Sequence, residues 1–399
     1  MKFDIFCEIQ RAPPWNGSDE ASLFAEVIAQ AKAAEAAGFE IWWQVEHHGA
    51  PNFSHSSAPA MVLTAIAMAT TKLRVGHAGV LAPFLINNPL RVAERAATLD
   101  ILSGGRLELG LAKSGGKEWE TFGVNAETAR NEVAEAMRMI PKMWSDEEFA
   151  SSTAGYRLPP RAVTPRPLQK PHPRLWQTCG SPESFRMAGE LGVGALGTTL
   201  LSPIRFLGQM MREHDGGLAQ CRAPAGAFVN PGKGAFTFVH VAESREAAIR
   251  NRAALSALWY VNAAAETFKV PRRIWYDMIK AGLHPNSARD TAAVATLDPN
   301  ETRIEPDDPA PLILLKRMAV GETIAPEEAH EVLEALDCVV IGDPDHCARR
   351  IRGFSSIGVE RMMCLMQFGF LEPDAILRSI ELTGRHLVGA APEPVPAKA

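Results

Sequence analysis

The stretch NNPLRVAERAATLDILSGGRLELGLA, residues 87–112, contains a complete helix–strand unit and decides the fold. Asn88 is a good N-cap residue, and Pro89 suits the first helical position because the N–H that it lacks has no intrahelical partner there. The helix is predicted to stop at the Ser-Gly-Gly of residues 103–105, where glycine allows a left-handed turn. A strand is predicted over residues 106–112.

The same alternation extends in both directions from this unit. Runs rich in β-branched and aromatic residues alternate with segments that have helical periodicity. The expected strands cover residues 1–9, 39–46, 73–83, 106–112, 175–179, 193–199, 235–242 and 360–368, and the expected helices cover residues 21–37, 59–70, 89–102, 125–144, 182–191, 204–215, 244–268, 345–356 and 373–387. About eight strands, each followed by a helix, predict the α/β class and a (β/α)8 TIM barrel with insertions. A doubly wound sheet would need fewer strands.

Two stretches interrupt the alternation and are interpreted as insertions in one barrel that spans residues 1–388. Residues 145–173 hold six prolines, which exclude a regular helix or a central strand. Residues 270–325 are rich in Pro, Asp and Arg and form the second expected insertion. Residues 389–399 are expected to be a flexible tail.

Composition excludes several classes of protein. The chain of 399 residues is 46% hydrophobic and 22% charged, so it can form a large core and is not disordered as a whole. Its formal charge of −5 includes no long run of one sign, so we expect neither nucleic acid nor a membrane as a partner. The six cysteines lack CxxC spacing, which argues against a disulfide scaffold or a zinc ribbon. Residues 1–15 do not resemble a secretory signal, so a cytoplasmic location is expected.

The string GVGALG at residues 192–197 matches the GxGxxG pattern of dinucleotide-binding turns. Such a turn must follow a strand and open a helix, so that its backbone amides point at phosphate. Here the string follows an expected helix and enters an expected strand. A nicotinamide-binding role is therefore not predicted for it.

The sharpest chemical feature is Glu46-His47-His48 at the end of the second strand. Active sites of (β/α)8 barrels lie at the carboxyl ends of the strands. Strand alternation places His47 on the same face as Trp43, so we expect it at the barrel mouth, where an imidazole can exchange protons near neutral pH. A histidine that only hydrogen-bonds within a loop is the alternative. A metal site is not expected, because adjacent histidines in an extended chain point in opposite directions.

A second candidate is Gly180-Ser181-Pro182-Glu183-Ser184, which follows the fifth expected strand. Ser181 would cap the next helix, leaving free amides and the Ser184 hydroxyl in its first turn. A helix N-terminus at this face of a barrel is a good phosphate site, and Lys113 could add a positive charge. The alternatives are an ordinary helix cap and a solvated lysine.

Several of these segments together resemble the bacterial luciferase-like flavin-dependent monooxygenases. They are MKFDIF at the N-terminus, Glu46-His47-His48, the block at residues 87–112, and VIGDPDHCARRI at residues 340–351. The likeness covers nearly the whole chain apart from the insertions.

The resemblance implies a barrel that binds reduced FMN at its C-terminal face and uses O2 as co-substrate. It implies an FMN-dependent monooxygenase that oxygenates a small organic substrate through a flavin hydroperoxide. Reduced FMN would come from a separate NAD(P)H:flavin reductase, and the protein would be a homodimer. The alternatives are a deazaflavin-dependent hydride-transfer oxidoreductase and a non-catalytic flavin-binding protein.

The resemblance also assigns roles to residues. It implies that His47 is the catalytic histidine and that Ala78-Gly79 is a non-proline cis peptide beside the flavin. The phosphate-binding residues of the family correspond to Ser181 and Ser184, next to Gly180. Lys113 replaces the usual arginine after the fourth strand, keeping the charge and losing the bidentate fork. The implied lid is the insertion at residues 270–325. Apart from the resemblance, Trp15, Trp43, Phe84 and Trp119 stand where an apolar or aromatic substrate pocket could form, and a place in the core is the equal alternative for each.

Overall fold

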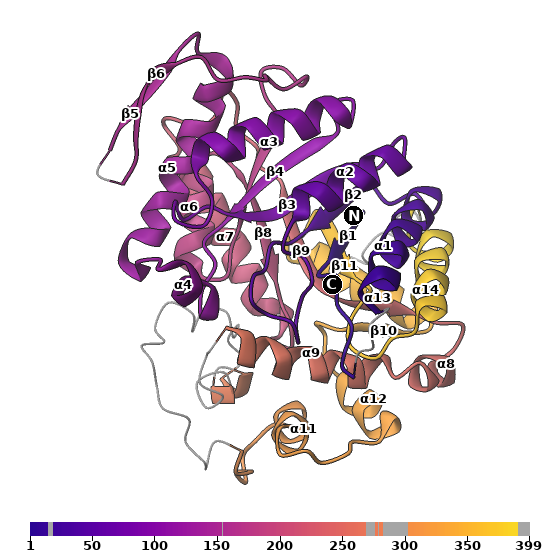
Figure 1. Cartoon of the computed structure of the whole chain (residues 1–399). Coiled ribbons are helices and arrows are strands. Elements are labelled where there is room, and N and C mark those ends of the chain that lie inside the picture. Colours follow the sequence, from indigo (N-terminus) through magenta and orange to yellow (C-terminus); the bar gives the residue numbers. More distant parts are fainter. Residues whose placement is uncertain (15–18, 154, 269–275, 278, 282–301, 390–399) are drawn as a thin grey trace, which may run out of the picture.

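A closed parallel barrel forms the centre of the computed structural model, which describes residues 1–14, 19–153, 155–268, 276–277, 279–281 and 302–389 (Figure 1). Eight parallel strands pair in sequence, and the last of them pairs with the first. In barrel order they are β1 (Lys2–Cys7), β2 (Ile41–Gln44), β3 (Arg74–Leu81), β4 (Leu107–Ala112), β7 (Arg174–Thr178), β8 (Gly194–Thr198), β9 (Lys233–Val241) and β11 (Arg361–Leu365). The predicted (β/α)8 barrel is confirmed.

Helices connect these strands and surround the barrel at most of the expected positions. They are α1 (Asp19–Ala36), α2 (Pro59–Ala69), α3 (Pro89–Leu102), α5 (Ala126–Ser145), α6 (Pro182–Glu190), α7 (Ile204–Gln220), α13 (Pro344–Ser356) and α14 (Pro373–His386). The cap of α3 forms as predicted, because the Asn88 side chain accepts a hydrogen bond from the Leu90 amide. The first and last helices, α1 and α14, lie side by side (Figure 1).

Other elements differ from the prediction. The single helix expected over residues 244–268 is two helices, α8 (Arg245–Arg250) and α9 (Ala253–Thr267). They are separated at Arg252, whose φ of +59° is left-handed and stops a right-handed helix. The short elements that the sequence analysis did not predict are α4 (Lys117–Phe122), α12 (Pro326–Glu334) and β10 (Val340–Gly342).

Both insertions contain more regular structure than expected. In the first, β5 (Phe149–Ser152) and β6 (Arg157–Arg161) form an antiparallel hairpin that projects from the barrel (Figure 1). The prolines of β6 exclude only a central strand, because a two-stranded hairpin leaves each strand an open edge. In the second, α11 (Ala310–Ala319) is helical. Residues 269–275, 278, 282–301 and 390–399, which include much of the expected lid and nearly all of the expected tail, lie outside the described residues.

The closure of the barrel is reinforced by a buried ion pair. Arg361, at the start of β11, donates two hydrogen bonds to Asp4 of β1, at 2.7 and 2.6 Å. The Trp43 indole donates a third hydrogen bond to Asp4, at 2.9 Å, as expected for a side chain that points into the barrel. Charge-assisted bidentate pairs of this kind are short and directional, so they define the register between the first and last strands.

A second buried carboxylate has a similar environment on the other side of the barrel. Glu108 of β4 accepts hydrogen bonds from Arg74, Arg174 and the Trp176 indole. The rings of Trp176 and Trp43 meet edge to face, with centroids 5.5 Å apart. We call these two indoles and the two carboxylates the barrel floor.

Two glycines make room for the indoles of the barrel floor. A Cβ at Gly76 would lie 2.4 Å from the Trp43 ring, and one at Gly194 would lie 2.3 Å from the Trp176 ring. Gly194 belongs to the GxGxxG string, which runs from the turn after α6 into β8. The string therefore packs against the core at Trp176.

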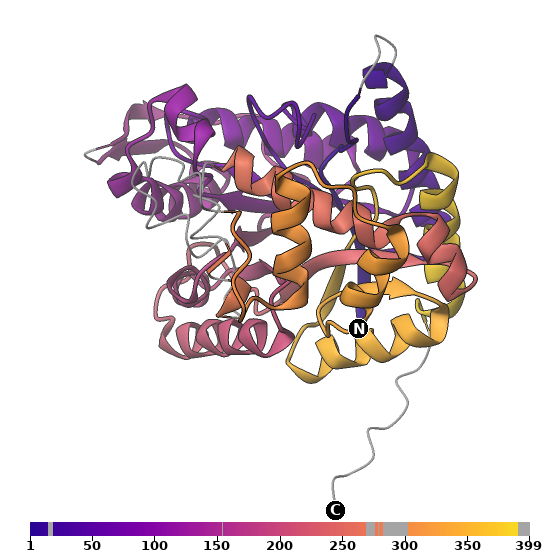
Figure 2. The ribbon, with the colours of Figure 1, turned by 90° about the horizontal axis from the view of Figure 1, so that it is seen from below.

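Helices α9, α11 and α12 lie together across one side of the molecule (Figure 2). Helix α9 contributes Tyr260 and Ala264 to the cavity described below, so it covers part of the barrel mouth. No helix among the described residues is long and apolar enough to cross a membrane.

Acid is expected to destabilise the fold through histidines that are buried in the neutral form. Burial lowers the pKa of His77 and His240 to about 4 and also lowers the pKa of His330. Below the ordinary histidine value of about 6.5, the unfolded chain takes up protons that the folded chain does not. The free energy of unfolding therefore has its full value above that pH and decreases as the pH falls. For a histidine with a folded pKa near 4, the decrease is about 2 kcal/mol near pH 5.

His330→Leu tests this dependence in α12. The His330 ring is 1% exposed, and neither of its nitrogens has a hydrogen-bond partner among the described residues. The variant should be more stable than the wild type in urea unfolding by about 1 kcal/mol near pH 7, with a larger difference near pH 5. His386→Leu, on an exposed part of α14, is the control. A difference that is independent of pH would contradict the prediction.

Candidate active site

A single cavity at the carboxyl ends of the strands contains all of the predicted site residues. It encloses about 1110 Å³, including its open mouth. The predicted residues that line it are His47, Ala78, Gly79, Lys113, Gly180, Ser181 and Ser184. Residues from four strand ends, far apart in the sequence, thus meet in one place.

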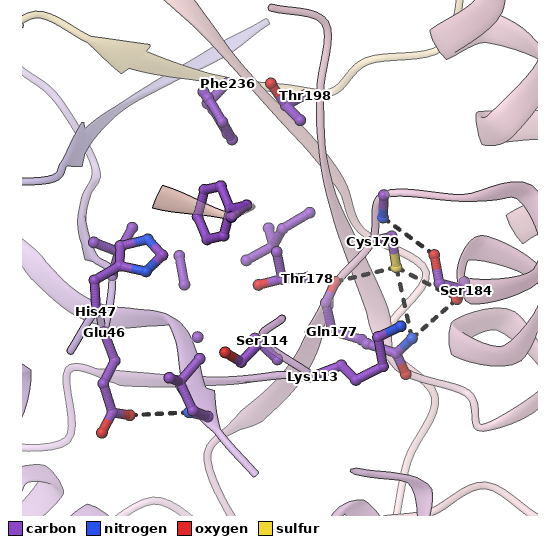
Figure 3. A pocket seen from close by; sticks show the side chains of 18 of the residues that line it. Glu46, His47, Lys113, Ser114, Gln177, Thr178, Cys179, Ser184, Thr198 and Phe236 are labelled. Carbon is purple, nitrogen blue, oxygen red and sulfur yellow. Dashed lines mark hydrogen bonds between the residues drawn. The ribbon is translucent and has the colours of Figure 1, made fainter. Parts of the chain in front are cut away.

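His47 lies between two carboxylates. It follows β2, and its ring points into the cavity (Figure 3). Its Nδ1 is 3.0 Å from Oε1 of Glu118, and its Nε2 is 3.4 Å from Oε2 of Glu8. The rings of Phe53 and Phe268 contact the imidazole edge to face, each with its centroid 5.4 Å away. The ring is therefore held on both nitrogens and on its sides.

Glu118 is the buried partner of His47 that sequence reasoning missed. It lies on α4 and also accepts hydrogen bonds from the His48 amide, at 2.8 Å, and from the Ser114 hydroxyl. Burial raises the pKa of Glu118, but His47, Ser114 and the His48 amide together outweigh burial and bring the pKa below its usual value. The carboxylate is thus charged at neutral pH.

Glu8 and Tyr260 complete this side of the cavity. Glu8 follows β1, and its side chain is 3% exposed. The Tyr260 hydroxyl, on α9, donates a hydrogen bond of 2.9 Å to Oε1 of Glu8. The period of two along β1 places Glu8 on the same face as Asp4 and Phe6, and this signal could have identified Glu8 from the sequence.

Glu46 has a structural role at the edge of the cavity. Its carboxylate accepts hydrogen bonds from the Leu81 amide and from Asn87, both at 2.9 Å, and lies 3.1 Å from Nε2 of His48. Burial raises the pKa of Glu46, but His48, Asn87 and the Leu81 amide outweigh it and lower the pKa overall. Glu46 therefore ties the end of β2 to the end of β3.

The Ala78–Gly79 peptide in β3 is cis, as the resemblance implied. The pairing of β3 with β4 shifts its register between His77 and Val80, at this peptide. A Cβ at Gly79 would lie 2.8 Å from the carbonyl carbon of Leu111 in β4. Only glycine fits at this position, because that backbone has no room to move away.

The N-terminus of α6 forms the opposite side of the cavity. Ser181 and Ser184 make a capping box, and the Ser184 hydroxyl accepts hydrogen bonds from the amides of Gly180 and Ser181, at 3.1 and 3.0 Å. Lys113 lies on this side as well, with its Nζ 5.1 Å from the centre of the Trp119 ring (Figure 3). Arg130 of α5 also lines the cavity and was not predicted.

A carboxylate of the chain itself lies at this helix terminus. The amide of Glu183 and the Ser181 hydroxyl both lower the pKa of the Glu183 carboxyl group. Its own amide is the largest cause of a lowered pKa for Glu183, which outweighs the effect of burial. The helix terminus thus already attracts an anionic group.

Three buried polar atoms between the two sides have no hydrogen-bond partner among the described residues. They are Oε1 of Gln177, Oγ1 of Thr178 and Oγ1 of Thr198, and all three residues line the cavity (Figure 3). Buried polar atoms are nearly always paired in folded proteins, so these atoms indicate a polar ligand. Their positions at the ends of β7 and β8 were the available signal in the sequence.

Of the four aromatic residues considered for the pocket, the three that the structure describes do not line the cavity, and Trp43 has the core position that was the alternative for it. Trp43 lies in the barrel floor, Phe84 packs on Tyr156, Trp119 lies beside Lys113, and Trp15 is outside the described residues. The aromatic lining instead consists of Phe6, Phe53, Phe236, Tyr260 and Phe268. Within the described part of the chain, no group of His, Cys, Asp and Glu is arranged to hold a metal ion.

Comparison with known proteins agrees with this geometry. The chain is 29% identical over 203 residues to the oxygenase component of a flavin-dependent trigonelline monooxygenase from Acinetobacter baylyi. That alignment covers 50% of this chain and 55% of the relative, so the chain spans about half the length of the relative that it matches.

Two solved structures share the fold over nearly their whole length. One is the oxygenating constituent of 3,6-diketocamphane monooxygenase from Pseudomonas putida in complex with FMN, with a TM-score of 0.70 and 17% identity, covering 99% of each chain. The other is a coenzyme F420-dependent tetrahydromethanopterin reductase from Methanopyrus kandleri, with a TM-score of 0.65 and 18% identity, covering 96% of this chain and 97% of that one. Residues 1–361 match the family described as luciferase-like monooxygenase. The chain belongs to the luciferase-like monooxygenase family.

Proposed function

We propose that this protein is an FMN-dependent monooxygenase, the oxygenase component of a two-component system, with residues 1–388 as one barrel domain. The observation that carries the proposal is the polarity of one cavity. A histidine held by carboxylates lies on one side, and an anion-binding helix terminus with two cationic side chains lies on the other. This arrangement suits a ligand with a phosphate at one end and a reactive ring at the other.

The phosphate end fits FMN. Lys113 and Arg130 supply positive charge beside the N-terminus of α6. The amides and hydroxyls of Ser181 and Ser184 hydrogen-bond to one another in this structure, so a phosphate would replace bonds of the capping box to use them as donors. Arg130 offers the planar fork that Lys113 lacks, so the loss of the usual arginine at Lys113 is compensated within the same cavity.

The middle of the cavity fits the polar edge of a flavin ring. The side-chain oxygens of Gln177, Thr178 and Thr198, which have no partner within the described part of the chain, would accept or donate hydrogen bonds there. The backbone at Ala78-Gly79 has no room for larger side chains on its β4 side and lines the same cavity. Reduced FMN, when bound, supplies the electrons that activate O2.

His47 is the proposed acid or base. Glu118 accepts from Nδ1 and thereby orients the ring, which leaves Nε2 facing Glu8 and the cavity. Because Glu118 is charged at neutral pH, it stabilises the ring when Nε2 holds a proton. The aromatic lining keeps water from the reacting atoms.

A separate NAD(P)H:flavin reductase is the proposed source of reduced FMN. The GxGxxG string of this chain packs the core and offers no nucleotide turn. The relative from Acinetobacter baylyi bears the name of an oxygenase component, which supports the same arrangement here.

The decisive experiment mixes protein carrying anaerobically reduced FMN with oxygenated buffer in a stopped-flow instrument. We expect the absorbance of oxidised flavin to return with a lag relative to free FMN, because a dry cavity slows the breakdown of the oxygen-reacted flavin. Flavin that binds and is oxidised at its free-solution rate would contradict the proposal. It would favour the coenzyme F420 chemistry of the second structural neighbour, or flavin binding without catalysis.

His47→Ala is the matched variant for this experiment. It should leave the Kd for FMN unchanged and slow the formation of product from any accepted substrate by about 10²-fold to 10⁴-fold, the usual contribution of a general acid or base. Equal losses of binding and of turnover would make His47 a binding residue instead.

Glu183→Gln should tighten FMN binding. The Glu183 carboxylate puts a negative charge in the first turn of α6, which would repel a phosphate there, and the variant removes this charge. We expect the Kd for FMN from flavin fluorescence quenching to fall by about threefold to tenfold. The Kd for riboflavin, which lacks the phosphate, should not change. Weaker FMN binding by the variant would contradict this prediction and would mean that the Glu183 carboxylate assists FMN binding.

We also propose a homodimer that pairs through α2 and α3. Helix α2 carries no charged residue, and its Met61 and Met68 are 75% and 69% exposed. Ile101 and Leu102 at the end of the neighbouring α3 are 45% and 49% exposed. Exposed apolar side chains on two neighbouring helices are typical of a protein–protein contact, and a second copy would present the same side chains.

Met61→Glu tests the dimer. We expect the molar mass from light scattering to fall from that of two chains to that of one at micromolar concentration, because the contact would have to bury a charge. Val320→Glu, at a site that is 63% exposed after α11, is the control and should change nothing. A monomeric wild type would end the proposal.

A further inference from the structure

The loop that joins β4 to α4 has an unfavourable backbone conformation at the wall of the cavity. Ser114 lies in this loop and has a φ of +69°, in the left-handed region. A side chain with a Cβ disfavours this region, whereas glycine adopts it freely. The chain has glycine at both of the next two positions, Gly115 and Gly116. A serine at the strained position therefore indicates a role for its hydroxyl group.

The same loop packs tightly against α9. A Cβ at Gly116 would lie 2.3 Å from the carbonyl oxygen of Phe268, the residue that follows α9 as its C-cap. The Phe268 ring also contacts the imidazole of His47. Backbone atoms this close leave the loop no room to shift toward α9. Ser114 is thus held in place where it lines the cavity (Figure 3).

The Ser114 hydroxyl donates its hydrogen to Oε2 of Glu118. The other oxygen of this carboxylate, Oε1, accepts from the His48 amide at 2.8 Å and lies 3.0 Å from Nδ1 of His47. Burial raises the pKa of Glu118, but these three partners outweigh burial and lower the pKa overall. An ionised carboxylate can only accept hydrogen bonds, so the single hydrogen of the Ser114 hydroxyl stays directed at Glu118.

This bond determines what Ser114 offers to a ligand. A hydroxyl has one hydrogen and two lone pairs, and here the hydrogen is already used. Among the described residues, none donates a hydrogen bond to this hydroxyl. Ser114 can therefore accept from an N–H or O–H group of a ligand and cannot donate to an ether, a carbonyl or a phosphate. It follows Lys113 in the sequence but does not suit the anion that Lys113 attracts.

We propose that Ser114 determines specificity, because its Oγ accepts a hydrogen bond from an N–H or O–H group of the bound ligand. The proposal rests on the proposed function, which assigns the anion site at α6 to the phosphate of FMN. The donor is either a polar group of the substrate or the ring N–H that FMN gains on reduction. Glu118 is the positioning residue, since it fixes the direction of the Ser114 hydrogen.

The test compares phenol, anisole and toluene as probes on the full chain loaded with oxidised FMN. Of these three rings, phenol alone can donate a hydrogen bond. Isothermal titration gives a Kd for each probe. Burial of apolar surface alone would favour toluene, because the phenol hydroxyl must leave water. We expect phenol to bind more tightly than anisole by about threefold to tenfold.

Two variants remove the Ser114 hydroxyl. Ser114→Ala and Ser114→Gly should both abolish the preference for phenol over anisole and leave the Kd for toluene unchanged. Glycine adopts the left-handed backbone without strain, so a preference lost in Ser114→Gly cannot be attributed to a distorted loop. Ser355→Ala, at an exposed position in α13, is the matched control and should change none of the three Kd values.

Glu118→Gln should change the preference in a different way. The His48 amide needs an acceptor, so the side-chain oxygen of the glutamine takes the place of Oε1 and its NH2 group faces Ser114. The Ser114 oxygen then accepts from this NH2 group, and its hydrogen turns toward the cavity. Anisole, whose ether oxygen is an acceptor, should bind about threefold more tightly than to the wild type, and the preference for phenol should vanish.

Anaerobic titration with reduced FMN identifies the source of the donor. If the donor is the substrate, Ser114→Ala loses the phenol preference and keeps both flavin Kd values. If the donor is the flavin, Ser114→Ala weakens the binding of reduced FMN by about threefold to tenfold and keeps the Kd for oxidised FMN. A wild type without the phenol preference, together with an unchanged Kd for reduced FMN in Ser114→Ala, would overturn the proposal.

The flavin titration also separates this proposal from the proposed function. A protein that binds FMN and shows neither effect at Ser114 overturns only the role of Ser114. A protein that does not bind FMN overturns the proposed function, and the three probes on the flavin-free protein still measure the preference for a hydrogen-bond donor.

Discussion

The barrel depends on the charge pair between Asp4 and Arg361. Asp4 lies on the first strand and Arg361 on the last, so the pair spans the closing seam of the sheet. Both side chains are almost fully buried, and removing one partner would leave an uncompensated charge, a change that costs about 3–5 kcal/mol in buried pairs. Trp43 links this pair to the opposite side through its contact with Trp176. The positions of all strand ends, and therefore of the site residues, follow from this closure.

The two opposite walls of the cavity differ in the charged residues that they carry. On one wall, His47 lies between Glu8 and Glu118, and on the other the N-terminus of α6 lies beside Lys113 and Arg130. The family resemblance identified His47 on one wall and Ser181 and Ser184 on the other. The carboxylates of Glu8 and Glu118 were found only in the structure.

Local signals in the sequence were enough for most of the fold. The Asn88 cap, the proline that follows it and the strand alternation are short-range features, and they placed α3 and the eight strands. The break at Arg252 was missed because it depends on a left-handed backbone that the residue type does not favour. The helix α11 was missed because its surroundings are rich in proline.

Site residues that are recognisable from their own position in the sequence were predicted. Residues whose role depends on contact with a distant partner were missed. His47 stands at a strand end, whereas Glu118 meets it across 71 residues of sequence, and Tyr260 meets Glu8 across 252. Pairs separated so widely cannot be read from spacing in one sequence. The aromatic lining was missed for the same reason, since Phe268 contacts His47 from far along the chain. Trp43 has the core position that the sequence left open for it, and its indole donates a hydrogen bond to Asp4.

The barrel floor has a consequence for how this protein can change over generations. The two indoles and their paired glycines fill the end of the barrel away from the cavity, and they share no side chain with the groups that face a ligand. Residues at the barrel mouth can therefore be replaced during evolution without loss of the stability that comes from the pairing of β1 with β11. Specificity for a new ligand can arise when residues such as Glu8 or Phe53 are replaced. The residues that keep the fold stable lie at the opposite end of the same eight strands.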